Sequence, residues 1–330
     1  MSTGAGNPPR VGLVTALQFE PVFDTLTAKV DAVVAPEPTE AGVATIVGDV
    51  VALISRGPTK ITAEHITRAG RLRHIAVTGS GADHVDVAAA RAAGVTVTTG
   101  AGVATQSVAE YVLGAILVGH RQLLMSNQVL LAERFDWTNR LSICPPGITG
   151  TTIGIVGYGH IGRRVSDILI GSFGAHVVAY DPFVDIGRAT APACAEAVDD
   201  LDELFARATA VSVHVPLSDT TRGLVSARQV GLLGPDGVLV NTSRGGVVDE
   251  ESVLAALAGR VLGMAWLDVF DPEPPTRQQL DRFARTPNLV VTPHLAGITM
   301  YGRRAAEADA VRRVLAQLAP QGVDRVLQID

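Results

Sequence analysis

The chain is poor in cysteine and in charge, and each scarcity excludes a class of protein. Its two cysteines, Cys144 and Cys194, are too few for a disulfide framework and give no metal-ligand spacing. Charged residues make up only 18% of the 330 residues and the net charge is −6, so we expect no basic face for nucleic acid. No apolar run reaches the ~18 residues of a membrane span, so we expect no membrane segment.

The amino-terminal segment and the histidines exclude two further possibilities. The first ten residues are polar and lack the apolar stretch of a signal peptide. Together with the few cysteines, this favours a cytoplasmic protein. The eight histidines show no paired spacing typical of a metal site. What is present is apolar: hydrophobic residues make up 47% of the chain, enough for two domains of ordinary size.

Short runs rich in Val and Ile alternate with Ala-rich stretches, a pattern typical of parallel strands joined by helices. A first series predicts strands at 11–16, 31–35, 51–56, 75–79 and 95–99. A long apolar helix is predicted over 107–125. A second series predicts strands at 152–156, 176–180, 210–215, 238–241, 263–267 and 289–292, with a final helix over 300–318.

A glycine turn stands near the middle of the chain, with a complete α/β series before it. The simplest architecture is therefore one discontinuous domain, 1–104 plus 295–330, into which a second domain, 105–294, is inserted. Two crossings between domains would form a hinge, and the cleft between them would be the natural substrate site.

The glycine turn follows a predicted strand and opens a predicted helix, which is the context of a dinucleotide site. The first glycine makes the tight turn, the second lets the backbone approach a pyrophosphate, and the third lets the helix pack on the strand. The helix N-terminus adds N–H groups and partial positive charge. The turn consists of Gly157, Tyr158, Gly159, His160, Ile161 and Gly162.

Asp181 ends the next predicted strand, at the spacing expected for a carboxylate that accepts hydrogen bonds from the adenosine ribose. A carboxylate there repels a 2′-phosphate, so NAD is favoured over NADP. The dipeptide Asp181-Pro182 is also a common turn, and a turn alone is the alternative interpretation.

Three later segments, each after a predicted strand, carry candidate catalytic side chains. Arg244, released by two glycines, suits a carboxylate and a neighbouring carbonyl oxygen, although pairing with a nearby acidic residue is the alternative. His294 is a candidate acid, because hydride transfer to a ketone leaves an alkoxide that needs a proton. Glu273 lies between two prolines; buried beside the imidazole it would stabilise the charged ring. Taken alone, these two would be an acidic surface loop and a structural histidine.

Together, the glycine turn and four segments resemble the D-specific 2-hydroxyacid dehydrogenases. The segments are VHVPLSDTTRGLV (213–225), NTSRGGVVDE (241–250), LDVFDPEP (267–274) and TPHLAG (292–297). The resemblance extends from about Val51 to Gly302. It implies an α/β protein with a Rossmann dinucleotide-binding domain inserted into a flavodoxin-like parallel substrate domain. It also implies a hydride transfer between NAD(H) and a small 2-hydroxy or 2-keto acid.

The resemblance assigns roles residue by residue. It implies that Arg244 binds the substrate carboxylate and carbonyl, that His294 is the acid and base, and that Glu273 is its partner. Segment 77–86 resembles a loop whose N–H groups hold the substrate carboxylate. Arg56 resembles a position near the distal group of the substrate, and a surface salt bridge is the alternative interpretation of Arg56. The small residues of that loop are Ser80, Gly81 and Ala82. Further implied cofactor contacts are His214, Val215, Pro216, Thr242, Ser243, Asp268 and Gly297.

Other functions stay open. The chain departs from the family pattern at 98–102 and 296–299, which leaves the substrate undetermined. Glu273 argues against formate oxidation, because the formate enzymes carry Gln there, whereas phosphite or phosphonate oxidation is not excluded. A non-enzymatic NADH-sensing corepressor could retain the same three residues, although no interaction tail or basic segment favours it. The resemblance also implies a homodimer paired through the NAD-binding domains, with 124–150 as the candidate arm.

Overall fold

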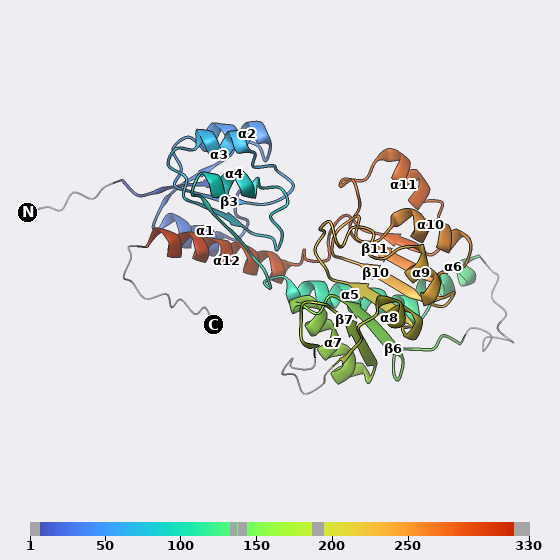
Figure 1. The fold of residues 1–330 in the computed structure, drawn as a ribbon. Coiled ribbons are helices and arrows are strands. Elements are labelled where there is room, and N and C mark those ends of the chain that lie inside the picture. Colours follow the sequence, from blue (N-terminus) through green and yellow to red (C-terminus); the bar gives the residue numbers. More distant parts are fainter. Residues whose placement is uncertain (1–6, 133–136, 138–143, 187–194, 320–330) are drawn as a thin grey trace, which may run out of the picture. The chain divides into compact units, whose positions relative to one another are not determined.

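The chain divides into two compact units, each with its own parallel sheet (Figure 1). The computed structural model describes residues 7–132, 137, 144–186 and 195–319. The first unit holds 1–104 and 299–330, and the second holds 105–298. From the sequence we expected the chain to return to the first unit at residue 295. In the structure residues 295–298 still belong to the second unit.

The first unit is built on a five-stranded sheet in the order β2-β1-β3-β4-β5. Its strands are β1 (Arg10–Leu13), β2 (Asp31–Val34), β3 (Ala52–Ser55), β4 (His74–Val77) and β5 (Thr96–Thr99). Its helices are α1 (Glu20–Thr27), α2 (Glu40–Ile46), α3 (Ala63–Arg68), α4 (Val87–Ala92) and α12 (Met300–Leu318). This strand order is the flavodoxin-like one, in which the connections reverse direction between β1 and β3.

Helices cover both faces of this sheet, α2, α3 and α4 on one and α1 with α12 on the other (Figure 1). α12 begins where Thr299 Oγ1 accepts the N–H of Gly302 at 2.9 Å, a side-chain N-cap. Arg313 ties the helix to the sheet, with Nη2 donating to Val77 O at 2.8 Å and Nη1 to Thr98 Oγ1 at 2.6 Å. The apolar side chains under α1 and α12 are Val11, Leu13, Val22, Leu26, Ala52, Ile54, Ala76, Ala310, Val311 and Val314.

His74, at the start of β4, is buried in this unit in its neutral form. Its Nε2 lies 2.8 Å from Oγ1 of Thr98, and its Nδ1 has no partner among the described residues. Burial, and after it the positive charge of Arg313, lower the pKa of His74 from 6.5 to about 4. The folded unit therefore excludes a proton that the unfolded chain binds.

We expect the first unit to lose stability as the pH falls from 6.5 to about 4, because the unfolded state then binds more protons. The pKa difference corresponds to about 3 kcal/mol of folding free energy that is lost as the pH falls from above 6.5 to below about 4. Urea unfolding at pH 7.5 and pH 4.5 should show a smaller pH dependence in His74→Gln than in the wild type. His176→Gln, at an exposed position, is the control, and equal pH dependence in all three proteins would contradict the assignment.

The second unit has a seven-stranded sheet in the order β12-β11-β10-β9-β6-β7-β8. Its strands are β6 (Thr152–Val156), β7 (His176–Tyr180), β8 (Glu196–Ala197), β9 (Ala210–Val213), β10 (Val238–Asn241), β11 (Met264–Leu267) and β12 (Leu289–Val291). Its helices are α5 (Thr105–His120), α6 (Leu123–Leu131), α7 (His160–Phe173), α8 (Leu201–Arg207), α9 (Ala227–Leu233), α10 (Glu250–Ala258) and α11 (Arg277–Phe283). From β8 to β11 this is the Rossmann order, with β12 added at one edge. The predicted fold class, a Rossmann domain inserted into a flavodoxin-like parallel domain, is confirmed.

The single long helix predicted over 107–125 is wrong, because the chain forms two helices there. α5 ends at His120 and α6 begins at Leu123. Between them Gln122 has φ +49°, a left-handed conformation that turns the chain. Just before the break, α5 lies close to β10: a Cβ at Gly119 would come within 2.7 Å of Val238 Cγ2.

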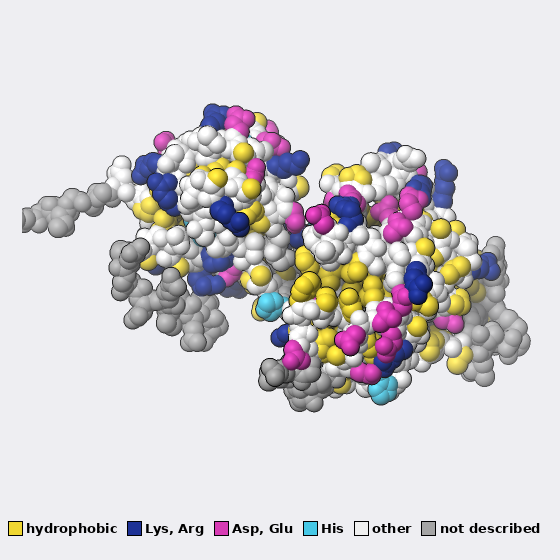
Figure 2. All heavy atoms as spheres, in the orientation of Figure 1, with side chains coloured by type: hydrophobic (Ala, Val, Ile, Leu, Met, Phe, Trp, Pro, Cys, Tyr) yellow, Lys and Arg dark blue, Asp and Glu magenta, His cyan; other side chains and the backbone are white. Residues whose placement is uncertain are grey.

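The described residues can be searched for a basic surface, a membrane-spanning helix and a metal-binding cluster. On the face shown in Figure 2, Lys and Arg side chains are scattered among Asp and Glu. None of the described helices is both long and apolar enough to cross a membrane. The described residues contain no cluster of three or more potential metal-ligating side chains. Cys144 is exposed and unpaired as a disulfide, and Cys194 lies outside the described residues.

Candidate active site

The glycine turn joins β6 to α7 as predicted, and steric crowding explains two of its three glycines. Gly157 has φ +92°, and a Cβ there would lie 2.8 Å from the carbonyl oxygen of His214. A Cβ at Gly162 would lie 2.2 Å from the carbonyl oxygen of Gly157. Gly159 differs, because no described atom lies within 4 Å of the place its Cβ would take. The second glycine therefore borders free space at the N-terminus of α7, where His160 and Ile161 form the first turn.

The polar atoms around this turn fit a bound dinucleotide. Both ring nitrogens of His214 and Oγ1 of Thr242 are buried and have no hydrogen-bond partner in the described part of the chain. Burial lowers the pKa of His214 to about 3, so its neutral ring offers one donor and one acceptor. Buried polar atoms are nearly always satisfied, so a polar ligand fits here. Val215 and Pro216 continue the same loop after β9.

Asp181, directly after β7, forms the turn that was the alternative interpretation, whereas its contact with a ribose stays a prediction. Its Oδ2 accepts the N–H of Tyr158 at 2.8 Å, and its Oδ1 accepts the N–H of Phe183 at 2.9 Å. The carboxylate therefore forms the predicted turn and also holds the backbone of the glycine turn at Tyr158. Each carboxylate oxygen accepts more than one hydrogen bond, so Asp181 keeps capacity for a ribose hydroxyl.

His294 and Glu273 lie together, on loops that follow the adjacent strands β12 and β11. Nδ1 of His294 is 2.6 Å from Oε1 of Glu273. From the sequence we considered a buried Glu273. In the structure the side chain of His294 is 46% exposed and that of Glu273 is 39% exposed. The pair thus sits at the surface of its unit, where a small molecule can reach the imidazole.

The loop that carries His294 is held by Asp268, the residue after β11. The side chain of Asp268 is fully buried, and its two oxygens accept the N–H groups of Leu295 and Ala296, each at 2.8 Å. The predicted contact of Asp268 with the cofactor stays a prediction, as does that of Gly297, which follows in the same loop. What the contacts establish is that Asp268 fixes the backbone next to His294.

Arg244 lies in the loop after β10, beside the loop that leads to Glu273. Gly245 makes this possible, since a Cβ there would lie 1.8 Å from the carbonyl oxygen of Phe270. The Arg244 side chain is half-buried, and its Nη1 donates to the carbonyl oxygen of Ser243 at 2.7 Å. Ser243 itself is buried and donates to Asn241 Oδ1 at 2.8 Å. The three predicted catalytic side chains thus follow three neighbouring strands of one sheet.

The predicted substrate residues lie in the first unit, at the carboxyl ends of its strands. Arg56 follows β3 and is half-buried, whereas Ser80, Gly81 and Ala82 follow β4 and are partly or fully exposed. Next to them, Nε2 of His84 lies 2.8 Å from Oγ of the buried Ser55. The carboxyl edge is where open parallel sheets bind ligands.

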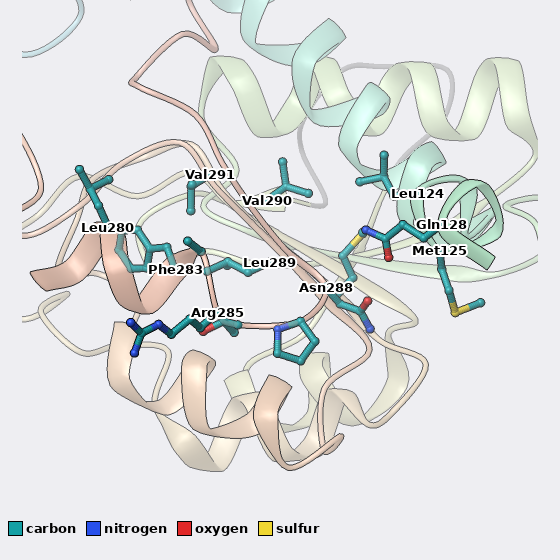
Figure 3. A pocket seen from close by; sticks show the side chains of 14 residues that line it. Leu124, Met125, Gln128, Leu280, Phe283, Arg285, Asn288, Leu289, Val290 and Val291 are labelled. Carbon is teal, nitrogen blue, oxygen red and sulfur yellow. The ribbon is translucent and has the colours of Figure 1, made fainter. Parts of the chain in front are cut away.

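Residues that the sequence interpretation missed include Tyr111, Trp266 and Thr292, which hydrogen-bond next to Asp268. Their separation along the chain gave no signal. A pocket of about 520 Å³ lies elsewhere in the second unit, between α6, α11 and the edge strand β12 (Figure 3). It contains none of the predicted site residues, and its lining is mixed, with Leu124 and Leu289 beside Gln128 and Asn288.

Comparison with known proteins identifies the family of the chain. Residues 113–296 match the model of the D-isomer specific 2-hydroxyacid dehydrogenase NAD binding domain. The D-3-phosphoglycerate dehydrogenase of Mycobacterium tuberculosis is 37% identical over 278 residues, which are 84% of this chain and 51% of that protein. The chain therefore spans about half the length of this relative.

Two further proteins match over most of their length. The (S)-sulfolactate dehydrogenase of Chromohalobacter salexigens is 38% identical over 267 residues, 80% of this chain and 84% of that protein. The crystal structure of an NADPH-dependent glyoxylate/hydroxypyruvate reductase from Sinorhizobium meliloti, in complex with NADP and malonate, has a TM-score of 0.79. It is 27% identical and the match covers 95% of this chain and 94% of that one. The resemblance read from the sequence is confirmed, and the chain belongs to the D-isomer specific 2-hydroxyacid dehydrogenase family.

Proposed function

We propose that the chain transfers a hydride between NAD(H) and a small 2-hydroxy or 2-keto acid. The observation that carries the proposal is the 2.6 Å contact between His294 Nδ1 and Glu273 Oε1. Both residues follow strands of the sheet that also carries the glycine turn. The names of the M. tuberculosis and C. salexigens relatives, which are dehydrogenases of such acids, support it. Bound NADH would supply the hydride. The residues of the chain would bind and orient the acid and transfer the proton.

His294 is the proposed acid and base. Glu273 engages Nδ1 and thereby fixes the ring orientation, which leaves Nε2 for the substrate. In the direction of reduction, the imidazolium donates its Nε2 proton to the carbonyl oxygen as negative charge develops there. In the direction of oxidation, neutral Nε2 accepts the hydroxyl proton. Glu273 stabilises the positive charge of the ring in either direction.

Arg244 is the proposed anchor of the substrate carboxylate. Its planar fork donates two parallel hydrogen bonds, which fixes both position and orientation. The backbone N–H groups at Ser80, Gly81 and Ala82 form the second proposed contact, in the manner of an anion-binding nest. Arg244, in the loop beside that of Glu273, would hold the carboxylate so that the carbonyl oxygen faces the proton donor.

NAD is the proposed cofactor. Asp181 supports NAD over NADP, because a carboxylate at the ribose repels a 2′-phosphate. The related Sinorhizobium structure contains NADP, so the two cofactors have to be compared directly. The remaining proposed contacts are His160, Ile161, His214, Val215, Pro216, Thr242, Ser243, Asp268 and Gly297.

The acid is proposed to carry a second anionic group, held by Arg56 and Arg303. Neither guanidinium has a hydrogen bond or ion pair within the described residues, and Nε of Arg303 is buried without an acceptor. Burial and then the charge of Arg303 lower the pKa of Arg56, against the opposing charge of Glu307. Arg56 follows β3, at the point between β1 and β3 where ligands of this fold bind. Two guanidinium groups there without a hydrogen-bond partner among the described residues favour a distal carboxylate, sulfonate or phosphate.

The test is steady-state turnover of the purified chain with NADH or NADPH. The panel is pyruvate, hydroxypyruvate, sulfopyruvate and phosphohydroxypyruvate, with phosphite and NAD as a separate arm. We expect NADH oxidation, a preference for NADH over NADPH, and the highest kcat/KM for an acid with a distal anion. Turnover of phosphite alone, or NADH binding without turnover of any acid, would overturn the proposal in favour of the two alternative functions.

Arg303→Gln isolates the distal group. We expect the KM of the acids with a distal anion to rise roughly tenfold or more, because a charge-assisted hydrogen bond is lost, with pyruvate unaffected. Arg304→Gln, at the exposed neighbouring position, is the matched control. Equal effects of Arg303→Gln on all acids would contradict the distal-anion assignment while leaving the reaction itself in place.

A homodimer through the second unit is also proposed. α6 exposes Leu123, Leu124, Leu130 and Leu131, the last with 75% of its surface accessible. The pocket of Figure 3 adjoins this helix and the edge strand β12. Clustered exposed apolar side chains beside a sheet edge mark an association surface. Part of the candidate arm, 133–136 and 138–143, lies outside the described residues. Light scattering should give twice the 34.3 kDa mass of the chain.

A further inference from the structure

His294 has an unusual backbone conformation that something must hold in place. Its φ is +54°, in the left-handed region that a residue with a Cβ adopts only at a cost in free energy. Its own N–H lies 2.9 Å from the carbonyl oxygens of both Asp268 and Thr292. The following two N–H groups, of Leu295 and Ala296, donate to the Asp268 carboxylate. The conformation of the proton donor thus depends on where that carboxylate lies.

A directed chain of hydrogen bonds reaches the same carboxylate from the other side. Trp266 Nε1 donates to the hydroxyl oxygen of Tyr111 at 2.6 Å, and the Tyr111 hydroxyl contacts Oγ1 of Thr292. Oγ1 of Thr292 donates to Oδ1 of Asp268 at 2.5 Å. Because the carboxylate only accepts, the Thr292 proton goes to Asp268, and Tyr111 must then donate to Thr292. The N–H and O–H donors of these hydrogen bonds therefore all point in one direction, from Trp266 towards Asp268.

The residues joined by these hydrogen bonds come from three different parts of the second unit. Tyr111 lies on α5, Trp266 on β11, and Thr292 directly after the edge strand β12. The rings of Tyr111 and Trp266 also pack edge to face, with centroids 6.2 Å apart. α5 packs against the central strands β9 and β10 of the sheet, so Tyr111 starts from a rigid position. These hydrogen bonds therefore tie the loop after the edge strand β12 to the interior of the unit.

Protonation of the tyrosine is secured by its surroundings. Burial raises the pKa of Tyr111, opposed by the hydrogen bonds to Thr292 and Trp266, and the charge and hydrogen-bonding of the nearby Asp268 carboxylate raise it further. The hydroxyl consequently stays a donor over the whole range in which such an enzyme operates. Its proton is available to orient Thr292 at any of those pH values.

We propose that Tyr111 is a positioning residue for the proton transfer, acting on His294 through Thr292 and Asp268. This rests on the proposed acid–base function of His294. By orienting Thr292, Tyr111 fixes the Asp268 carboxylate, and the carboxylate fixes the left-handed turn at His294. Tyr111 does not touch the reacting atoms. Its contribution is to the position of the imidazole, and it therefore acts on the chemical step more than on binding.

The test compares Thr292→Val with Thr292→Ser, and adds Tyr111→Phe. Valine keeps the shape of threonine and loses the hydroxyl, whereas serine keeps the hydroxyl. We expect kcat to fall roughly tenfold in Thr292→Val and roughly three- to tenfold in Tyr111→Phe, with KM for the acid and Kd for NADH unchanged. Thr292→Ser should retain activity near the wild type. Tyr301→Phe, on an exposed tyrosine, is the control.

Two further measurements separate positioning from general damage. In a His294→Gln background, Tyr111→Phe should change the residual kcat by less than about twofold, because both act through one group. Hydrogen exchange of the 292–298 segment should quicken in Thr292→Val and Tyr111→Phe but not in Thr292→Ser. Equal losses in Thr292→Val and Thr292→Ser, or additive losses with His294→Gln, would overturn the proposal. If no acid turns over at all, the proposed function fails, and the exchange data still decide whether the loop depends on Tyr111.

Discussion

His294→Gln is expected to lower kcat for 2-keto acid reduction by roughly a hundred- to ten-thousandfold, the range that a positioned proton donor contributes. Glutamine keeps a polar side chain on the same loop but supplies no acidic proton. Glu273→Gln should lower kcat less, because it keeps a hydrogen-bond partner for Nδ1 and removes only the negative charge. Binding of NADH, measured by its fluorescence, should stay unchanged in both variants.

The matched control for this prediction is His176→Gln, at an exposed histidine at the start of β7 and away from the His294–Glu273 pair. It should have wild-type kcat. If His294→Gln kept more than about a tenth of wild-type kcat, the imidazole would not be the proton donor, and the proposed mechanism would be wrong.

The glycines of the turn should separate cofactor binding from stability. Gly162→Ala is expected to lower Tm by roughly 5 °C or more, because its Cβ would lie 2.2 Å from a backbone oxygen of the protein itself. Gly159→Ala places its Cβ in free space, so Tm without cofactor should not change. It should weaken NADH binding, because that space is where the pyrophosphate is proposed to approach the backbone.

Thermal unfolding without cofactor and NADH titration measure the two effects separately. Gly171→Ala, within α7 and with open space around it, is the control for an added methyl group on the same helix. Wild-type NADH affinity in Gly159→Ala would place the pyrophosphate elsewhere. An unchanged Tm in Gly162→Ala would mean that the turn relaxes freely, contrary to the crowding described above.

The sequence predicted best where local pattern and turn chemistry agree. The strands at 152–156, 176–180 and 238–241 and the final helix 300–318 have the bounds observed. The break between α5 and α6 was not predicted, since apolar residues continue through it and Gln122 carries no turn signal. β8 was missed because it has only two residues, both exposed, so neither length nor burial marks it.

At the site, motifs identified the residues that follow strands but not the contacts that hold them. The loops of Arg244, Glu273 and His294 were predicted because each follows a strand of the same parallel sheet. Their support was not, since Tyr111 is 155 residues from Trp266 and 181 residues from Thr292. Such contacts depend on how three elements pack, and no local pattern encodes them. The exposure of the His294–Glu273 pair is likewise a result of packing.

The return of α12 to the first unit has a consequence for synthesis. The apolar face of the first sheet under α12 is covered only when residues 300–318 have left the ribosome. All of 105–298 is made in between, which takes roughly 10 to 40 seconds at cellular rates of translation. The second unit is continuous in the chain and can complete its own core during that interval. The sheet that is begun first is therefore the one finished last, and until then its uncovered face is the part of the nascent chain most in need of a chaperone.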